Sequence, residues 1–211
     1  MLRTLIAATA SACLAAGAAQ AATLVSVTGS FYDADRDFTD IDDALGFVAG
    51  ASADATFDVT AIDYPRGDIG SFTSATTTLE EFLGDDAASL SGGSDLTLEQ
   101  SVFVLTGQIM LDGTEDVFSV GSDDGFRLTI DGMLISENTA PRGFEFTDAT
   151  PGLPAGLYTF TLVYFENQGF TGVEFRVDGS IVAAAPVPLP AAMILFGPAL
   201  AGLAYARRRR A

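Results

Sequence analysis

The chain has 211 residues and a formal net charge of −18 at pH 7, with 28 acidic residues against ten arginines. It contains no histidine, lysine or tryptophan, and its one cysteine lies near the N-terminus, which excludes the usual histidine-, lysine- or thiol-dependent catalysis in the rest of the chain. An acidic excess of this size repels nucleic acid, so a nucleic-acid-binding protein is excluded as well.

Residues 1–21 have the pattern of a secretory signal peptide. A short start containing Arg3 precedes an apolar run from Leu5 to Ala19, and small residues then predict cleavage between Ala21 and Ala22. The apolar run is shorter than the ~20 residues of a comfortable membrane span. Cleavage would remove Cys13 and leave a mature protein without disulfides. The alternatives are lipidation at Cys13 and a retained amphipathic N-terminus.

Residues 22–182 are expected to form one domain. All 28 acidic residues and only five of the arginines lie between residues 22 and 185, which gives this segment a net charge of −23. Most of these carboxylates are expected to serve solubility, although the charge also favours divalent cations.

Alternation of apolar and polar residues dominates this domain and predicts strands separated by turn residues. The expected fold is all-β, an antiparallel, jelly-roll-like β-sandwich. Asp131-Gly132 is a typical two-residue hairpin turn. The expected strands are Thr23–Tyr32, Ala55–Ile62, Ser101–Leu111, Asp116–Ser122, Gly125–Ile130, Met133–Glu137, Gly156–Glu166 and Gly172–Val177.

Six aspartates lie close together at positions 33, 35, 37, 40, 42 and 43. Their spacing begins like an EF-hand loop, but Phe38 stands where that loop needs glycine and Ala44 where it needs glutamate. We therefore expect a solvated acidic loop, with an irregular calcium loop as the alternative. Further along, Thr78 and Glu81 form a capping box that predicts a helix ending near Gly84, within a polar surface stretch from Ser71 to Asp95.

Residues 117–132 read Val-Phe-Ser-Val-Gly-Ser-Asp-Asp-Gly-Phe-Arg-Leu-Thr-Ile-Asp-Gly, with matching strands at 102–110, 157–166 and 172–175. This pattern resembles the PA14 domain family over residues 101–178, whereas Thr23–Ser94 matches poorly. The resemblance implies an antiparallel β-sandwich, often a carbohydrate-binding or adhesin module.

Asp123-Asp124 is the candidate site. Adjacent side chains of an ordinary strand point to opposite faces, so convergence on one cation requires a turn or an unusual peptide bond, and Gly125 permits a sharp turn. Calcium prefers ~6–8 oxygen ligands. In lectin-like members of the resembled family this pair binds calcium, which holds sugar hydroxyls, and Asn167 is the positional candidate for completing the site. The alternative is a structural turn whose carboxylates accept local amides.

No catalytic residues are expected, and the protein is not expected to be an enzyme. A glycosidase needs only two carboxylates, so composition leaves this class open, but no acid pair lies in a recognisable active-site frame. Phe144 and Phe170 lie in irregular segments and are candidates for sugar stacking, whereas the other aromatic residues are expected in the core.

The C-terminus has three parts. A stiff linker at 183–190 leads into an uncharged segment at 191–206 and then an arginine-rich tail at 207–211. The apolar segment covers ~24 Å as a helix, against ~30 Å for a bilayer core, and the arginines would keep the tail cytoplasmic. This predicts a transmembrane helix with the domain outside; the alternative is a buried core helix.

These three parts resemble the bacterial PEP-CTERM sorting signal in its VPLPA variant. The residues that carry the resemblance are Val187, Pro188, Leu189, Pro190, Ala191, Arg207, Arg208, Arg209 and Arg210. The resemblance implies processing by an exosortase and a cell-surface or exopolysaccharide-matrix protein, exported and at least transiently anchored in the membrane. The alternatives are a calcium-dependent carbohydrate-binding adhesin, with a polysaccharide as partner, and a carbohydrate-active enzyme.

Overall fold

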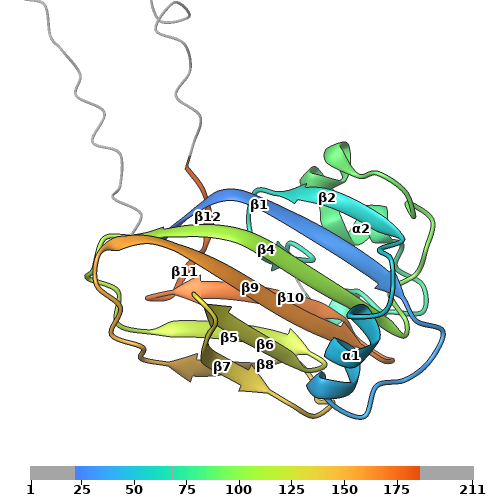
Figure 1. Ribbon diagram of the computed structural model, residues 1–211. Helices are drawn as coiled ribbons and strands as arrows, with labels where there is room; N and C mark the ends of the chain where they lie inside the picture. The colour runs from blue at the N-terminus through green and yellow to red at the C-terminus, as the bar shows by residue number, and fades with distance from the viewer. Residues whose placement is uncertain (1–21, 68, 186–211) are drawn as a thin grey trace, which may run out of the picture.

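A computed structural model describes residues 22–67 and 69–185, which form two packed β-sheets (Figure 1). The predicted signal peptide at 1–21, the sorting motif at 187–191, the apolar segment and the arginine tail lie outside the described residues. Among the described residues, no helix is long and apolar enough to cross a membrane.

The first sheet has the strand order β12-β1-β4-β9-β6-β7, and β2 also pairs with β1. Its pairs are antiparallel except for β12, which runs parallel to β1. The strands are β1 (Ala22–Asp33), β2 (Ala55–Val59), β4 (Ser101–Leu111), β6 (Phe126–Ile130), β7 (Met133–Asn138), β9 (Gly156–Glu166) and β12 (Ala183–Ala184). Two residues of the expected linker thus belong to the sheet.

The second sheet has the order β11-β10-β5-β8, with β3 also paired to β10, and all its pairs are antiparallel. Its strands are β3 (Asp63–Tyr64), β5 (Phe118–Asp123), β8 (Glu145–Ala149), β10 (Gly172–Val177) and β11 (Ser180–Ile181). Of these, β3, β8 and β11 were not predicted, because two are only two residues long and the exposed β8 carries no alternating apolar pattern.

The core lies between the two sheets and is built from the inward-facing residues of each strand. Phe103 and Tyr164 stack across β4 and β9 with ring centroids 5.6 Å apart, and Phe118 packs on Phe175 across β5 and β10 at 6.0 Å. Two sheets that pack face to face around a shared apolar core confirm the predicted all-β sandwich.

The predicted capping box and hairpin are confirmed. Helix α2 (Leu79–Leu83) begins after Thr78, whose hydroxyl accepts from the amide of Glu81 while the Glu81 carboxylate accepts from the amide of Thr78. It lies between the 3₁₀ helices η1 (Ile69–Ser71) and η2 (Gly84–Ser89). Asp131 and Gly132 join β6 to β7 with positive φ, as a two-residue turn requires.

The acidic segment around residue 40 is not the loop that the sequence predicts. Helix α1 (Ile41–Val48) begins there, and the carboxylate of Asp40 caps it by accepting from the amide of Asp43. The helix packs Ile41 and Ala44 against Val163 and Phe165 on the outer face of the first sheet. The sequence does not predict this helix because a run of aspartates is also typical of a solvated loop. In the structure Asp40 caps α1, and Asp42 and Asp43 lie in its first turn.

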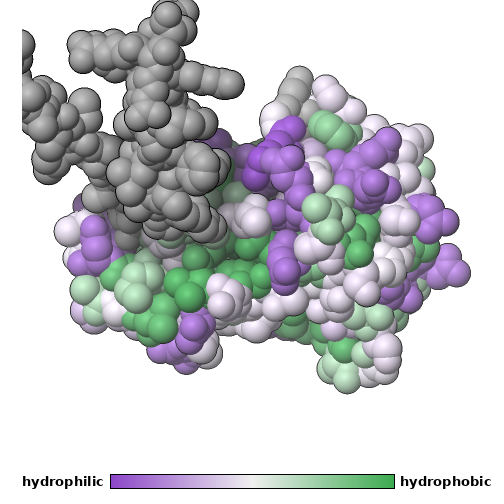
Figure 2. All heavy atoms as spheres, turned by 90° about the horizontal axis from the view of Figure 1, so that it is seen from above, coloured by the Kyte–Doolittle hydropathy of each residue, from purple (hydrophilic) through white to green (hydrophobic). Residues whose placement is uncertain are grey.

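The two ends of the sandwich differ. At one end Ala183 pairs with Thr23, so the first and last described residues lie together; at the other, Asp33, Ser101 and Glu166 are aligned. Met110 and Leu157, which pair across β4 and β9 near the first end, are both exposed. Seen from above, apolar residues gather over part of the surface and hydrophilic residues over another part (Figure 2).

Candidate functional site

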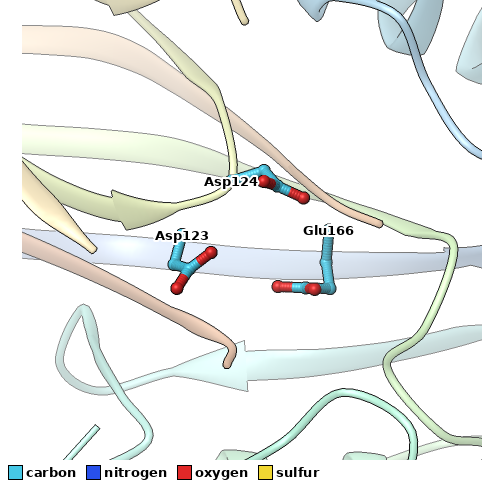
Figure 3. A group of neighbouring side chains, drawn as sticks. All are labelled: Asp123, Asp124 and Glu166. Carbon is cyan, nitrogen blue, oxygen red and sulfur yellow. The ribbon is translucent and has the colours of Figure 1, made fainter. Parts of the chain in front are cut away.

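Three carboxylates meet at the end of the sandwich where β5 and β9 terminate. Asp123 is the last residue of β5, Asp124 follows it, and Glu166 is the last residue of β9. One oxygen from each lies within 4.8 Å of the others, and Figure 3 shows the three groups turned toward one another. Their exposures are 6%, 5% and 0%, so the cluster is buried.

The backbone around the aspartate pair has the unusual peptide bond that convergence was expected to require, since the bond between Asp123 and Asp124 is cis. The hydroxyl of Ser122 donates to the carbonyl of Asp124 at 2.6 Å. Gly125 was expected to permit a sharp turn; its φ is not positive, and the structure shows that a glycine is needed there for space. A Cβ atom there would lie 2.5 Å from the ring of Phe165 and 2.8 Å from the carbonyl oxygen of Asn138.

The Asp124 carboxylate connects two loops that are distant in sequence. Its Oδ1 accepts from the amide of Arg142 at 3.0 Å and its Oδ2 from the amide of Asn167 at 2.8 Å. The alternative of a simple turn invoked local amides, but these donors lie on the loop before β8 and the loop after β9. Burial raises the pKa of Asp123, and the backbone of Phe144 lowers it in part.

Tyr164 organises the interior side of the cluster. Its hydroxyl lies 2.6 Å from the Asp123 carbonyl oxygen, 2.9 Å from Glu166 Oε2 and 2.8 Å from Thr171 Oγ1, and it accepts from the amide of Gly172 at 3.3 Å. A hydroxyl has a single proton, and the Asp123 carbonyl is able only to accept it. The contact between Tyr164 and Glu166 is therefore satisfied best when Glu166 itself carries a proton.

Burial and mutual repulsion raise the pKa values of the cluster. Burial, followed by the charge of Asp124, raises the pKa of Glu166 to about 9. Burial and then the Asp124 charge raise the pKa of Asp123 to about 7, and burial raises that of Asp124 despite its two amide donors. Without a cation, the cluster therefore holds protons near neutral pH.

Arg142 is the basic residue beside the cluster. Its guanidinium donates to Thr147 Oγ1, Ser122 Oγ and the carbonyl of Glu145 at 2.8–3.1 Å, and its charge favours ionised Asp123. Burial lowers the pKa of Arg142. One guanidinium balances one of three carboxylates, which leaves an acidic excess in a buried position.

The residues of the cluster fit a divalent cation. Glu166 Oε1 is buried and has no hydrogen-bond partner within the described part of the chain. Such an atom is costly to bury unless a proton or a cation satisfies it. An all-oxygen donor set with an excess of negative charge suits Ca²⁺ or Mg²⁺ and not the softer transition metals. Asp123, Asp124 and Glu166 would hold the ion, which could present open coordination positions to hydroxyl groups.

Asn167 lies next to the cluster, but its side chain serves a different contact. Its Oδ1 accepts from the amide of Phe38 at 2.7 Å, and its Nδ2 donates to the carbonyl of Phe38 at 3.0 Å. Asn167 thus joins the loop after β9 to the segment before α1, and only its backbone amide reaches Asp124.

The acidic segment at 33–43 contains no comparable cluster. Asp43 pairs with Arg36, Asp42 with Arg127, and Asp40 caps α1. Across residues 22–67 and 69–185, the carboxylates of Asp123, Asp124 and Glu166 form the one close group of three or more potential metal ligands.

Glu166 was missed as a member of the site, although its signal is present in the sequence. Phe160, Leu162 and Tyr164 occupy the inward positions of β9, and Glu166 continues this alternation with an acid where an apolar residue is expected. A charged residue in a core position indicates a partner or a function.

Similar folds occur among solved structures, although no protein-family model and no curated protein matches the chain. The PA14 domain of the antifreeze protein MpAFP is 22% identical with a TM-score of 0.62, and the match covers 81% of this chain and 92% of that one. A PA14 sugar-binding domain from an RTX adhesin is 21% identical with a TM-score of 0.54, covering 77% of this chain and all of that one.

These likenesses show the PA14 fold for the described chain. The match with the antifreeze-protein domain covers more of the chain than residues 101–178, where the sequence carries the resemblance. The first half therefore contributes to the same fold, as the pairing of β1 with β4 requires.

Proposed function

We propose that this protein is a cell-surface carbohydrate-binding domain that uses a calcium ion held by Asp123, Asp124 and Glu166. The observation that carries the proposal is the buried oxygen of Glu166, which has no partner among the described residues although two further carboxylates lie beside it. The PA14 fold supports this function because one protein of similar fold is described as a sugar-binding domain of an adhesin.

The geometry favours a cation over glycoside hydrolysis. A glycosidase places two carboxylates on either side of the scissile bond, in a site that admits the sugar between them. Here one oxygen from each of the three carboxylates lies within 4.8 Å of the others, which leaves no space for a sugar ring between them. Asp123, Asp124 and Glu166 would hold a cation in this arrangement, and the cation would offer coordination to sugar hydroxyls.

Binding to an array of defined glycans tests the proposed function. The protein is expected to bind a subset of glycans in calcium and to lose all binding in EDTA. Asp124→Asn should abolish binding in calcium as well, because it removes a carboxylate from the ion. Glycan binding that persists unchanged in EDTA would contradict a role for the ion.

We further propose export and surface retention through residues 187–211, with an exosortase as the partner of this segment. The position of the acids supports this arrangement, because Ala22 and Ala183 lie at the end of the sandwich opposite Glu166. The eleven residues of β9 separate these ends by ~30 Å. A domain tethered through its C-terminus would present the acid cluster away from the membrane.

Cell fractionation tests the sorting proposal. Deletion of Arg207–Arg210 is expected to leave the domain secreted but no longer retained at the surface, since these arginines would stop the apolar segment in the membrane. Unchanged surface retention of the deletion variant would contradict the proposal.

A further inference from the structure

Two phenylalanines form an aromatic pair beside the acid cluster, on the second sheet. The rings of Phe144 and Phe146 are 5.4 Å apart and almost perpendicular, at 87°. Phe146 is 38% exposed. Both rings rest on Gly121, because a Cβ atom there would lie 2.5 Å from Phe144 Cζ and 2.9 Å from Phe146 Cε1.

The pair is continuous with the acids. Phe146 is the register partner of Gly121 on β5. Gly121 lies two residues before Asp123, so Gly121 and Asp123 are ~7 Å apart along the strand. The amide of Arg142 donates to the Asp124 carboxylate at 3.0 Å. One short segment, residues 142–146, therefore connects the carboxylates to the rings.

Arg176 adds a polar group to this surface. Its guanidinium lies 4.8 Å from the centroid of the Phe146 ring, and its Nε donates to the carboxylate of Glu174. The Arg176 side chain is 39% exposed, so the group is held in place while remaining accessible. A fixed cation beside an exposed ring provides hydrogen-bond donors at the edge of an apolar surface.

We infer that Phe146, supported by Phe144 and Arg176, forms a second sugar subsite, and that the ligand is an oligosaccharide and not a single sugar. This inference rests on the proposed function. A pyranose ring has an apolar face of C–H groups that stacks on aromatic rings, and a rim of hydroxyls that accept from a guanidinium. One sugar coordinated at the ion would place the next one over Phe146.

The test compares the wild type with Phe146→Ala and with Leu157→Ala, which removes another exposed apolar side chain at the opposite end of the sandwich. Each protein is applied in calcium to an array that carries mono- and oligosaccharides of the same sugars. Phe146→Ala is expected to weaken binding to oligosaccharides about tenfold. Its binding to monosaccharides and its calorimetric affinity for calcium should stay at the wild-type values, and Leu157→Ala should behave as wild type.

Several results would overturn the inference. Equal oligosaccharide binding by Phe146→Ala and wild type would remove Phe146 from the site, while leaving calcium-dependent sugar binding intact. A wild type that binds calcium but no glycan would overturn the proposed function itself, and with it the subsite. A dimer in light scattering that Phe146→Ala dissociates would assign the rings to a second copy of the chain.

Gly121→Ala independently tests whether the position of the Phe144 and Phe146 rings matters for binding. The added methyl group would displace Phe144 and Phe146 without touching their chemistry. We expect the same selective loss of oligosaccharide binding, with calcium affinity retained. Retained oligosaccharide binding in a folded Gly121→Ala protein would contradict the role of the ring pair.

Discussion

The two acidic regions of the molecule have opposite physical characters. Residues 33–43 carry six aspartates, and three of them either pair with an arginine or cap a helix. The other region is the cluster of Asp123, Asp124 and Glu166. Its three carboxylates are buried, and burial and their mutual repulsion raise their pKa values. The region richer in acids is thus structural, and the smaller one has the properties of a binding site.

Under the proposed function, the density of acids along the sequence is a poor guide to a cation site. A solvated carboxylate has little to gain from an ion, because water and nearby donors already satisfy it. A buried carboxylate without enough donors gains much more, since the alternative is a proton or an unsatisfied charge. Burial and the number of available donors therefore decide which acids bind.

The largest expected effect comes from Glu166→Gln in EDTA. The folded pKa of Glu166 is about 9 against 4.5 for the free side chain, so the unfolded chain releases its proton first as the pH rises. Through Glu166 the wild type therefore loses stability between about pH 4.5 and pH 9. The variant lacks this contribution, while both proteins keep the contribution of Asp123. Urea unfolding should show similar stabilities at pH 4 and an advantage on the order of several kcal/mol for the variant at pH 9.

Excess calcium should make the wild type more stable than Glu166→Gln at pH 9, because the ion replaces the proton on the wild type and binds the variant less well. A difference between the two proteins that is the same at pH 4 and pH 9 would show that Glu166 does not titrate in the folded state as described.

Tyr164→Phe is expected to destabilise the protein by about 1–3 kcal/mol. The substitution leaves the Asp123 carbonyl and the Gly172 amide without the hydroxyl that now contacts both. Tyr158→Phe is the matched control, since its hydroxyl donates to the carbonyl of Pro154 in an exposed position. Chemical denaturation should show almost no change for the control; equal losses in both variants would argue against Tyr164 as the organiser of the cluster.

A smaller effect is expected in the acidic segment. Asp40→Ala should destabilise the protein by about 1 kcal/mol, because it removes the N-cap of α1. Thermal unfolding should show this loss equally with calcium and with EDTA. An effect that depends on calcium would mean that this segment takes part in ion binding.

Much of the fold could be predicted from the sequence, because alternation and turn residues act locally. β4, β9 and β10 begin and end at the predicted residues, and the capping box at Thr78 and the turn at Asp131-Gly132 are confirmed. Helix α1 was missed because its aspartates fit a loop as well as a first helical turn. The exposed strand β8 was missed because it forms by pairing with β5, and its own residues carry no strand pattern.

The site could be predicted only in part. The spacing of residues identified Asp123 and Asp124 as a pair, but the convergence of their carboxylates depends on backbone geometry and on the distant amides of Arg142 and Asn167. Glu166 joins them because β5 and β9 end together, which is a property of the sheet arrangement. The position of the Phe146 ring likewise depends on Gly121 in the neighbouring strand, and this pairing is known only from the strand register.

Calorimetric titration of calcium at pH 8 tests the central claim most directly. The wild type should show saturable binding to one site, and Asp123→Asn/Asp124→Asn should show none. The matched control, Asp35→Asn/Asp42→Asn, removes the same charge from the acidic segment and should bind as the wild type does. Absence of binding by the wild type, or an equal loss in both double variants, would contradict a calcium site at Asp123, Asp124 and Glu166.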